Sequence, residues 1–239
     1  MGEYRLTALA VNGGKLRYFP VNLDIQGSRI VVVGGGPVAS RKCATLLDAG
    51  AAITVIAPKL DAHLDKLAAA GAIEVVTRKY VTGDLSGAVL VFAATDDSEV
   101  NRIIAAEAKK SGIAVNVADD PDAGTFTLPA TIARGDLLVT VSTGGRCPAL
   151  AAGIRRDLEN RLGSEYAVVA DIMGAVREKL LTEKAGSAYN KSLLDKLASR
   201  DLPHLAARGA FAEIDRILLD LFGPGYTLAE LGVTEKDSE

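Results

Sequence analysis

Short apolar runs alternate with amphipathic stretches along residues 29–118. Arg29–Val33 is a β-branched run bounded by glycines, which is typical of a parallel strand buried on both faces. The stretch after it predicts a helix that Gly50 ends. The apolar face of this helix repeats at helical spacing and consists of Ala39, Cys43, Leu46 and Leu47.

The same alternation continues to residue 118. Four further strands are predicted at 53–57, 73–77, 88–94 and 114–117. Two further helices are predicted, from about Asp61 to Ala70 and from Ser98 to about Lys110. Strands that alternate with helices in this way predict an α/β fold with a doubly wound parallel sheet.

The pattern changes beyond residue 118. Two β-prone runs, 125–132 and 137–143, are joined by Arg134-Gly135-Asp136 and predict an antiparallel hairpin. Pro129 inside the first run indicates an edge strand or a bulge, because proline cannot donate to a ladder. A hairpin region is therefore expected after the α/β region.

The rest of the chain is predicted to be helical. A helix is expected to begin at Pro148, and helical pattern continues to about Gly223 with breaks near Gly163, Gly186 and Pro203. The charged end, 234–239, is expected to fray. We therefore expect three parts, with the boundaries 1–118, 119–147 and 148–239.

Composition narrows the class of protein. The 239 residues are 49% hydrophobic and 24% charged with a mean hydropathy of +0.21, the profile of a globular protein. A net charge of −3 gives no indication of nucleic-acid binding, and no apolar stretch is long enough to predict a membrane span. Cys43 and Cys147 are too few for a disulfide framework, and Cys43 is expected to be buried. With no apolar leader at residues 1–18, we expect a cytoplasmic protein, and its two histidines predict no dedicated zinc site.

A glycine-rich turn follows the first predicted strand. Gly34-x-Gly36-x-x-Ala39 fits the dinucleotide fingerprint of a Rossmann-type sheet. Gly34 permits the tight turn, Gly36 lets the backbone approach a pyrophosphate, and Ala39 keeps the helix close to the sheet. The helix start then offers free N–H groups to the phosphates. The alternative is a glycine turn that serves packing alone.

The residues leave the choice between NAD and NADP open. The second strand usually ends in an acid that binds the ribose 2′-hydroxyl, but here it ends Val55-Ile56-Ala57-Pro58-Lys59. Lys59 could bind a 2′-phosphate or could be an ordinary surface lysine. No Tyr-x-x-x-Lys pair and no Walker loop occurs, so neither a short-chain dehydrogenase mechanism nor a P-loop is supported.

One carboxylate stands where such sheets bind their ligands. Asp119 follows the strand 114–117 at its carboxyl end, the edge at which open α/β sheets place ligands. There it could act as a general base. The alternative is that Asp119, Asp120 and Asp122 form a turn around Pro121.

Several segments in chain order resemble one family, the precorrin-2 dehydrogenase/sirohydrochlorin ferrochelatase family, which includes the N-terminal module of siroheme synthases. The resemblance covers about residues 18–160. The segments that carry it are 18–23 (YFPVNL), 34–42 (GGGPVASRK), 93–97 (AATDD) with Asn101, 116–121 (NVADDP), Thr125-Phe126 with Pro129, and 141–145 (VSTGG) with Pro148.

The resemblance implies a fold and an activity. The fold would be a Rossmann-type parallel sheet, a small β dimerisation region and a C-terminal helical domain. The reaction would oxidise precorrin-2 to sirohydrochlorin with NAD⁺, and some members also insert Fe²⁺ as a second substrate. The protein would be a homodimer.

The resemblance also assigns roles to single residues. Asp119 matches the catalytic aspartate of the family. Thr143 stands where some members carry a regulatory phosphorylated serine, so that regulation is in doubt for this chain. The positions that match cofactor contacts, together with the fingerprint glycines, are Gly34, Gly36, Pro37, Val38, Pro58, Lys59 and Thr95.

The substrate that the resemblance implies is a polycarboxylate, so its site should be locally basic. Residues 146–200 hold ten Lys or Arg against seven Asp or Glu, a modest excess that a solvated helix face would also show. Arg146, in the glycine turn, is the residue expected to bind a substrate carboxylate. No metal-ligand set is predicted.

Two other functions fit parts of the pattern. A non-catalytic NAD(H)-sensing regulatory domain would share the Rossmann fold and an oligomeric interface, but would not need the loop 116–121. A ferrochelatase without dehydrogenase activity would not need the glycine fingerprint, because metal insertion uses no dinucleotide.

Overall fold

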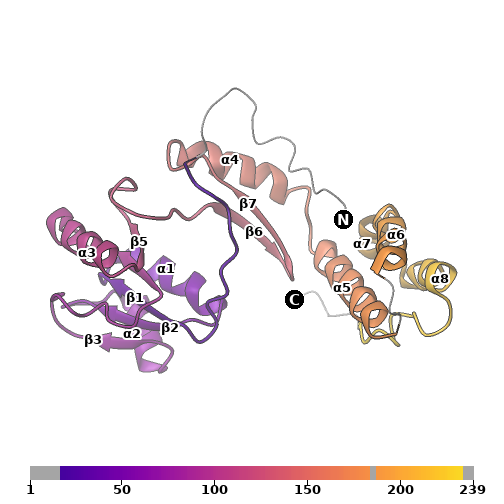
Figure 1. The fold of residues 1–239 in the computed structure, drawn as a ribbon, viewed down its shortest axis with the longest axis horizontal. Helices are drawn as coiled ribbons and strands as arrows, with labels where there is room; N and C mark the ends of the chain where they lie inside the picture. Colours follow the sequence, from indigo (N-terminus) through magenta and orange to yellow (C-terminus); the bar gives the residue numbers. More distant parts are fainter. Residues whose placement is uncertain (1–16, 184–186, 234–239) are drawn as a thin grey trace. The chain divides into compact units, whose positions relative to one another are not determined.

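The computed structural model describes residues 17–183 and 187–233. By their internal contacts these residues form two compact units, one that ends at Leu128 and one that begins at Pro129 (Figure 1). The hairpin and the C-terminal helices share the second unit. The three-part division with boundaries at 118 and 147 stays a prediction.

The first unit is built on a five-stranded sheet in which all strand pairs are parallel, in the order β3-β2-β1-β4-β5 (Figure 1). The strands are β1 (Arg29–Val33), β2 (Ala52–Ile56), β3 (Glu74–Val76), β4 (Leu90–Ala93) and β5 (Ala114–Val117). The chain order reverses between β1 and β4. Open α/β sheets bind their ligands at the carboxyl ends of the two strands that flank such a point.

Both faces of this sheet are covered, as the apolar runs predicted. Alternate residues of β1 belong to opposite cores: Ile30 and Val32 pack with α1 (Pro37–Asp48) and α2 (Ala62–Ala69). Val31 and Val33 pack with α3 (Ser98–Lys110) on the other face. The predicted doubly wound α/β fold is confirmed. Cys43 is fully buried in the α1 core, as expected, and burial raises the pKa of its thiol to about 11.

The segment after β5 differs from its prediction. Residues 125–132 were expected to form one strand, but β6 is Ala130–Arg134 and pairs with β7 (Leu137–Val141). Thr125 instead lies along β5, where its N–H donates to Val115 O at 2.8 Å and its hydroxyl accepts from Val115 N. The strand therefore begins after Pro129, which has no N–H to give to a ladder.

Within its described residues, the second unit combines the β6–β7 hairpin with five helices. α4 (Pro148–Glu159) packs on both strands of the hairpin. The remaining helices share a separate apolar core and are α5 (Glu165–Glu183), α6 (Ser187–Ala198), α7 (Leu202–Ala207) and α8 (Phe211–Phe222). No helix in the described ranges is both long and apolar enough to cross a membrane.

Two of the three predicted helix breaks, those near Gly163 and Pro203, fall in the described residues. Gly163 lies between α4 and α5, as expected. A break also lies near Pro203, as expected, because α6 ends at Ala198 and α7 begins at Leu202. Pro203 itself lies in the first turn of α7, where its missing N–H has no intrahelical partner to lose. Gly186 and the frayed end at 234–239 lie outside the described residues.

Candidate functional site

The turn after β1 is packed too closely for side chains at its first two glycines. A Cβ on Gly34, which has a φ of 126°, would lie 2.2 Å from Ala94 O. A Cβ on Gly35 would lie 2.0 Å from Lys59 O. The backbone of the turn therefore packs directly against the ends of β4 and β2. This close approach is what the fingerprint requires of its first glycine.

Gly36 differs from its two neighbours, because a Cβ there would meet no atom within 4 Å. It is the N-cap of α1, Pro37 follows it in the first turn, and no side chain in the described part of the chain caps this helix start. The first-turn N–H groups and the positive end of the helix dipole thus face an open space beside Gly36. This arrangement fits the pyrophosphate of a dinucleotide.

The end of β2 offers no acid for a ribose. Pro58 and Lys59 are exposed next to the glycine turn. The nearest carboxylate in sequence, Asp61, caps α2 and accepts from the N–H groups of His63 and Leu64 at 3.1 and 2.8 Å. Asp61 is therefore engaged as the cap of α2.

Asp119 follows β5, exposed and with both carboxylate oxygens hydrogen-bonded. The Ser98 hydroxyl donates to Oδ2 at 2.6 Å, and Asn101 Nδ2 donates to Oδ1 at 2.8 Å. The pKa of this carboxyl lies below its usual range, chiefly because of the Ser98 hydrogen bond; burial acts in the opposite direction, and the Asn101 hydrogen bond lowers the pKa further. Asp119 is therefore ionised at neutral pH.

Asn101 is a site residue to which the sequence analysis gave no role of its own. It is 1% exposed and lies on the buried face of α3 with Ile104, Ala105 and Ala108. A polar residue on the apolar face of a predicted helix is the signal that could have singled it out, because buried amides need hydrogen-bond partners. Ser98, at the exposed start of α3, gives no comparable signal.

The structure brings most of the predicted residues of the first unit to one edge of the sheet. Gly34 lies against Ala94 and Thr95, and Thr95 is hydrogen-bonded to Asn101, which binds Asp119. Val38 and Pro37 open α1 from the same turn. This edge is the carboxyl end of β1, β4 and β5, where the chain order of the strands reverses.

Arg146 and Thr143 belong to the second unit. Arg146 is exposed in the turn before α4, and its N–H donates to Thr143 O at 3.2 Å. The Thr143 hydroxyl accepts from Cys147 N at 3.1 Å, next to the start of α4. The role of Arg146 in substrate binding stays a prediction.

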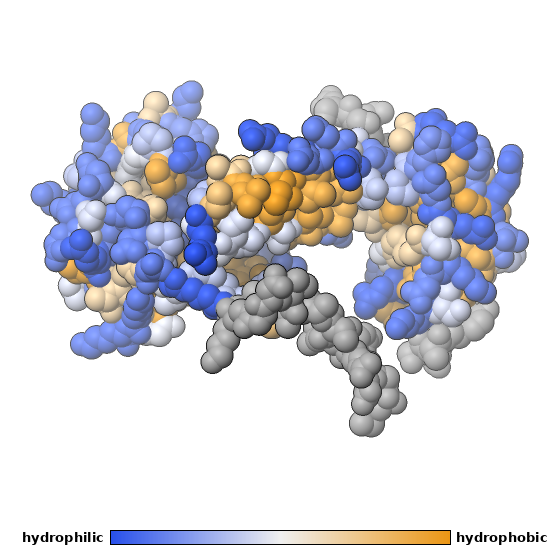
Figure 2. Space-filling view, turned by 90° about the horizontal axis from the view of Figure 1, so that it is seen from above, coloured by the Kyte–Doolittle hydropathy of each residue, from blue (hydrophilic) through white to orange (hydrophobic). Residues whose placement is uncertain are grey.

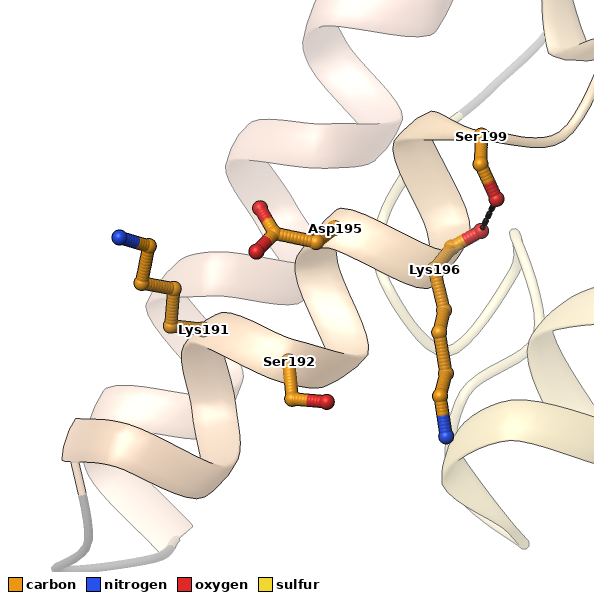
Figure 3. Close-up of a pocket in the computed structure, with 5 residues that line it drawn as sticks. All are labelled: Lys191, Ser192, Asp195, Lys196 and Ser199. Atoms are coloured by element: carbon orange, nitrogen blue, oxygen red, sulfur yellow. Dashed lines mark hydrogen bonds between the residues drawn. The ribbon is translucent and has the colours of Figure 1, made fainter.

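Two hollows of the described surface are lined by other residues of the second unit. One, of about 440 Å³, opens over α6, where the Lys191 and Lys196 side chains point in different directions and Ser199 Oγ donates to Lys196 O at 2.7 Å (Figure 3). Another, of about 560 Å³, lies between α5 and residues 231–233. No group of three or more His, Cys, Asp or Glu in the described ranges could hold a metal ion.

An apolar surface covers part of the second unit (Figure 2). It lies on α4, where Leu150 and Ile154 are 54% and 39% exposed. On the hairpin, the face opposite the inner residue Ile132 is also exposed, and it carries Leu138 at 47%. We call Leu150, Ile154 and Leu138 the apolar surface of the second unit.

Comparison with known proteins gives consistent matches. Residues 21–130 match a family described as putative NAD(P)-binding. The chain is 38% identical to siroheme synthase 3 of Aeromonas hydrophila over 206 residues, which is 86% of this chain and 44% of that protein. It is 42% identical to the siroheme synthase of Chromobacterium violaceum over 163 residues, 68% of this chain and 35% of that protein. The chain thus spans less than half the length of these relatives.

A solved structure matches more completely. The precorrin-2 dehydrogenase SirC is similar with a TM-score of 0.70 at 28% sequence identity. The match covers 83% of this chain and 100% of that one. The parallel sheet, the small antiparallel sheet and the C-terminal helices therefore form an architecture already known from a dehydrogenase.

Proposed function

This chain belongs to the precorrin-2 dehydrogenase and siroheme synthase family, and on that premise we propose that it oxidises precorrin-2 to sirohydrochlorin. NAD is the cofactor, in agreement with the NAD(P)-binding family match and the precorrin-2 dehydrogenase neighbour. One observation carries the proposal: an exposed, ionised carboxylate is fixed at the sheet edge that also holds the glycine turn.

The chemistry follows from these positions. The oxidation removes a hydride and a proton from precorrin-2, and NAD⁺, when bound, accepts the hydride. Gly36 and the start of α1 would hold its pyrophosphate. Asp119 takes the proton as general base, because it is ionised at neutral pH. Since its side chain is exposed, it can pass the proton on to solvent.

The test removes the carboxylate alone. We expect Asp119→Ala to lose at least about a hundredfold in NAD⁺-dependent turnover, the usual scale for a general base. Its NAD affinity should stay unchanged. The measurement is NADH absorbance together with the sirohydrochlorin spectrum, with calorimetric titration of NAD as the control. Wild-type protein that binds NAD but does not turn over precorrin-2 would favour an NAD(H)-sensing domain instead.

Insertion of Fe²⁺ into sirohydrochlorin is the second candidate activity. The observation that favours it is again Asp119, whose ionised carboxylate can accept the pyrrole N–H protons that a metal ion displaces. Fe²⁺ would be a substrate here. Comparing the rate of Co²⁺ or Fe²⁺ insertion with and without protein, and with Asp119→Ala, decides it. An equal rate in all three samples contradicts chelatase activity.

We also propose that the protein is a homodimer through the apolar surface of the second unit. An isolated two-stranded hairpin is marginally stable in water, and here the exposed hairpin face carries Leu138 while α4 exposes Leu150 and Ile154. Leu138→Glu combined with Leu150→Glu should convert a dimer to a monomer in light-scattering chromatography. Leu219→Glu, on the exposed face of α8, is the matched control and should leave the dimer intact.

We place the reaction in the cytoplasm. Both cysteines are free thiols, and Cys147 is exposed. Exposed thiols persist in the reducing compartment, which also supplies NAD⁺. Fractionation of cells that express the tagged protein tests this placement, and recovery in the periplasmic fraction would contradict it.

A further inference from the structure

All hydrogen-bonding positions of the Asn101 side chain have partners. Its Oδ1 accepts from the N–H of Thr95 at 3.1 Å and from the Thr95 hydroxyl at 2.8 Å. Its two Nδ2 protons go to Thr95 O at 3.2 Å and to Asp119 Oδ1 at 2.8 Å. The donors and acceptors of Thr95 thus fix the orientation of the amide, and one N–H of that fixed amide points at Asp119.

Thr95 is itself anchored to the glycine turn. A Cβ on Gly34 would lie 3.1 Å from Thr95 N, so the β4–α3 turn and the β1–α1 turn are in close contact. Asn101 therefore spans the distance between the backbone beside the proposed dinucleotide site and the proposed catalytic carboxylate. Because it is 1% exposed, water cannot replace these hydrogen bonds.

From this geometry we propose that Asn101 is the positioning residue of the site, holding Asp119 at a set place relative to the β4–α3 turn while Ser98 holds the other oxygen. The proposal rests on the proposed function for its catalytic meaning. Hydride and proton removal need both acceptors in place at once, and reaction rates fall steeply with small displacements. Asn101 would act through Asp119 and need not touch the substrate.

The first test needs no activity. In carbon- and nitrogen-labelled protein, NMR should show the Asp119 carboxyl titrating below the usual range for aspartate. The side-chain NH₂ signal of wild-type Asn101 should shift with the same midpoint, because one of its protons is bonded to that carboxylate. If the chemical shift of the Asn101 NH₂ group does not change as Asp119 titrates, the proposal is overturned.

Variants separate positioning from general packing. Asn101→Leu and Ser98→Ala each remove one donor, so the pKa of Asp119 should rise in both. Asn116→Leu is the matched control: Asn116 is also buried, accepting from Lys42 Nζ at 2.8 Å and donating to Phe126 O at 3.1 Å. It does not bond Asp119, so the Asp119 titration should stay as in wild type. An equal shift in Asn116→Leu and Asn101→Leu overturns the proposal.

The activity profile gives the second test. In Asn101→Leu the acid limb of kcat/KM should move to higher pH, because the base becomes protonated at higher pH. kcat at the optimum should fall at least tenfold, with less than a threefold change in NAD affinity. A lower rate with an unmoved pH profile overturns the proposal. A wild-type protein without turnover whose Asn101 and Asp119 titrate together refutes the dehydrogenase function and leaves the positioning of Asp119 standing.

Discussion

At the scale of single residues, three consecutive glycines have different physical reasons to be there. Gly34 combines a positive φ with a close approach to Ala94 O. Gly35 has no positive φ but lies too close to Lys59 O and Ala57 Cβ for a side chain, and Gly36 faces open space. The fingerprint gives roles to the first and third of these, and the contact at Gly35 is a matter of packing that depends on where β2 ends.

Adding one methyl group at Gly35 and at Gly36 therefore tests these two reasons separately. Gly35→Ala should destabilise the protein by about 1–3 kcal/mol, because the methyl overlaps the backbone of Lys59. Gly36→Ala should leave the urea midpoint nearly unchanged and weaken NAD binding at least about tenfold, or about 1.4 kcal/mol. Urea unfolding and calorimetric titration measure both. Unchanged NAD affinity in Gly36→Ala would place the pyrophosphate elsewhere.

At the scale of elements, helix α8 shows that the spacing of apolar residues decides which face of a helix is buried. In α8 the residues Ile214, Leu218 and Phe222 recur at i, i+4 and i+8 and are buried against α5 to α7. Leu219, the next residue after Leu218, is 40% exposed. The helix thus stabilises the second unit through one stripe of its surface.

Neighbouring leucines of α8 test this stripe. Leu218→Ala should lower the free energy of unfolding by about 2–5 kcal/mol, since it removes a fully buried side chain and leaves a cavity. Leu219→Ala should cost less than about 1 kcal/mol. Far-UV circular dichroism in urea reports mainly the helical second unit. Equal losses in the two variants would mean that α8 packs on a different face.

At the scale of the whole molecule, the chain divides between a unit with the glycine turn and Asp119 and a unit with Arg146 and the apolar surface. The proposed cofactor contacts all belong to the first unit. A ligand that binds only folded protein stabilises the unit that holds it. Bound NAD should therefore raise the free energy of unfolding of the first unit only.

Hydrogen exchange resolves this effect by region. At a hundred times its dissociation constant, NAD should stabilise the first unit by about 2.7 kcal/mol. Exchange in α1 and α3 should slow accordingly, while exchange in α5 and α8 stays unchanged. Gly36→Ala is the control: with at least tenfold weaker binding it should keep no more than about 1.4 kcal/mol of this stabilisation at the same concentration. Equal protection of both units would show that NAD contacts, or is coupled to, the second unit.

Much of the fold was predictable because hydrophobic periodicity is a local property. The five strands of the sheet, the glycine turn and Asp119 at the end of β5 could all be read from spacing within a few residues. The hairpin was also predicted, but its first strand began too early. The run 125–132 is β-prone on both sides of Pro129, and the pairing of Thr125 with Val115 holds the start of the run along β5 and not in the hairpin.

The hydrogen bonds of the site were decided by tertiary structure. The sequence placed Asp119 at the sheet edge, but its partners Ser98 and Asn101 precede it by 21 and 18 residues. Periodicity shows which face of α3 is buried, yet it cannot show which acceptor a buried amide will meet, because that depends on how strands β4 and β5 align. The sequence by itself therefore determined a dinucleotide fold with a candidate base, and the packing of α3 decided how that base is held.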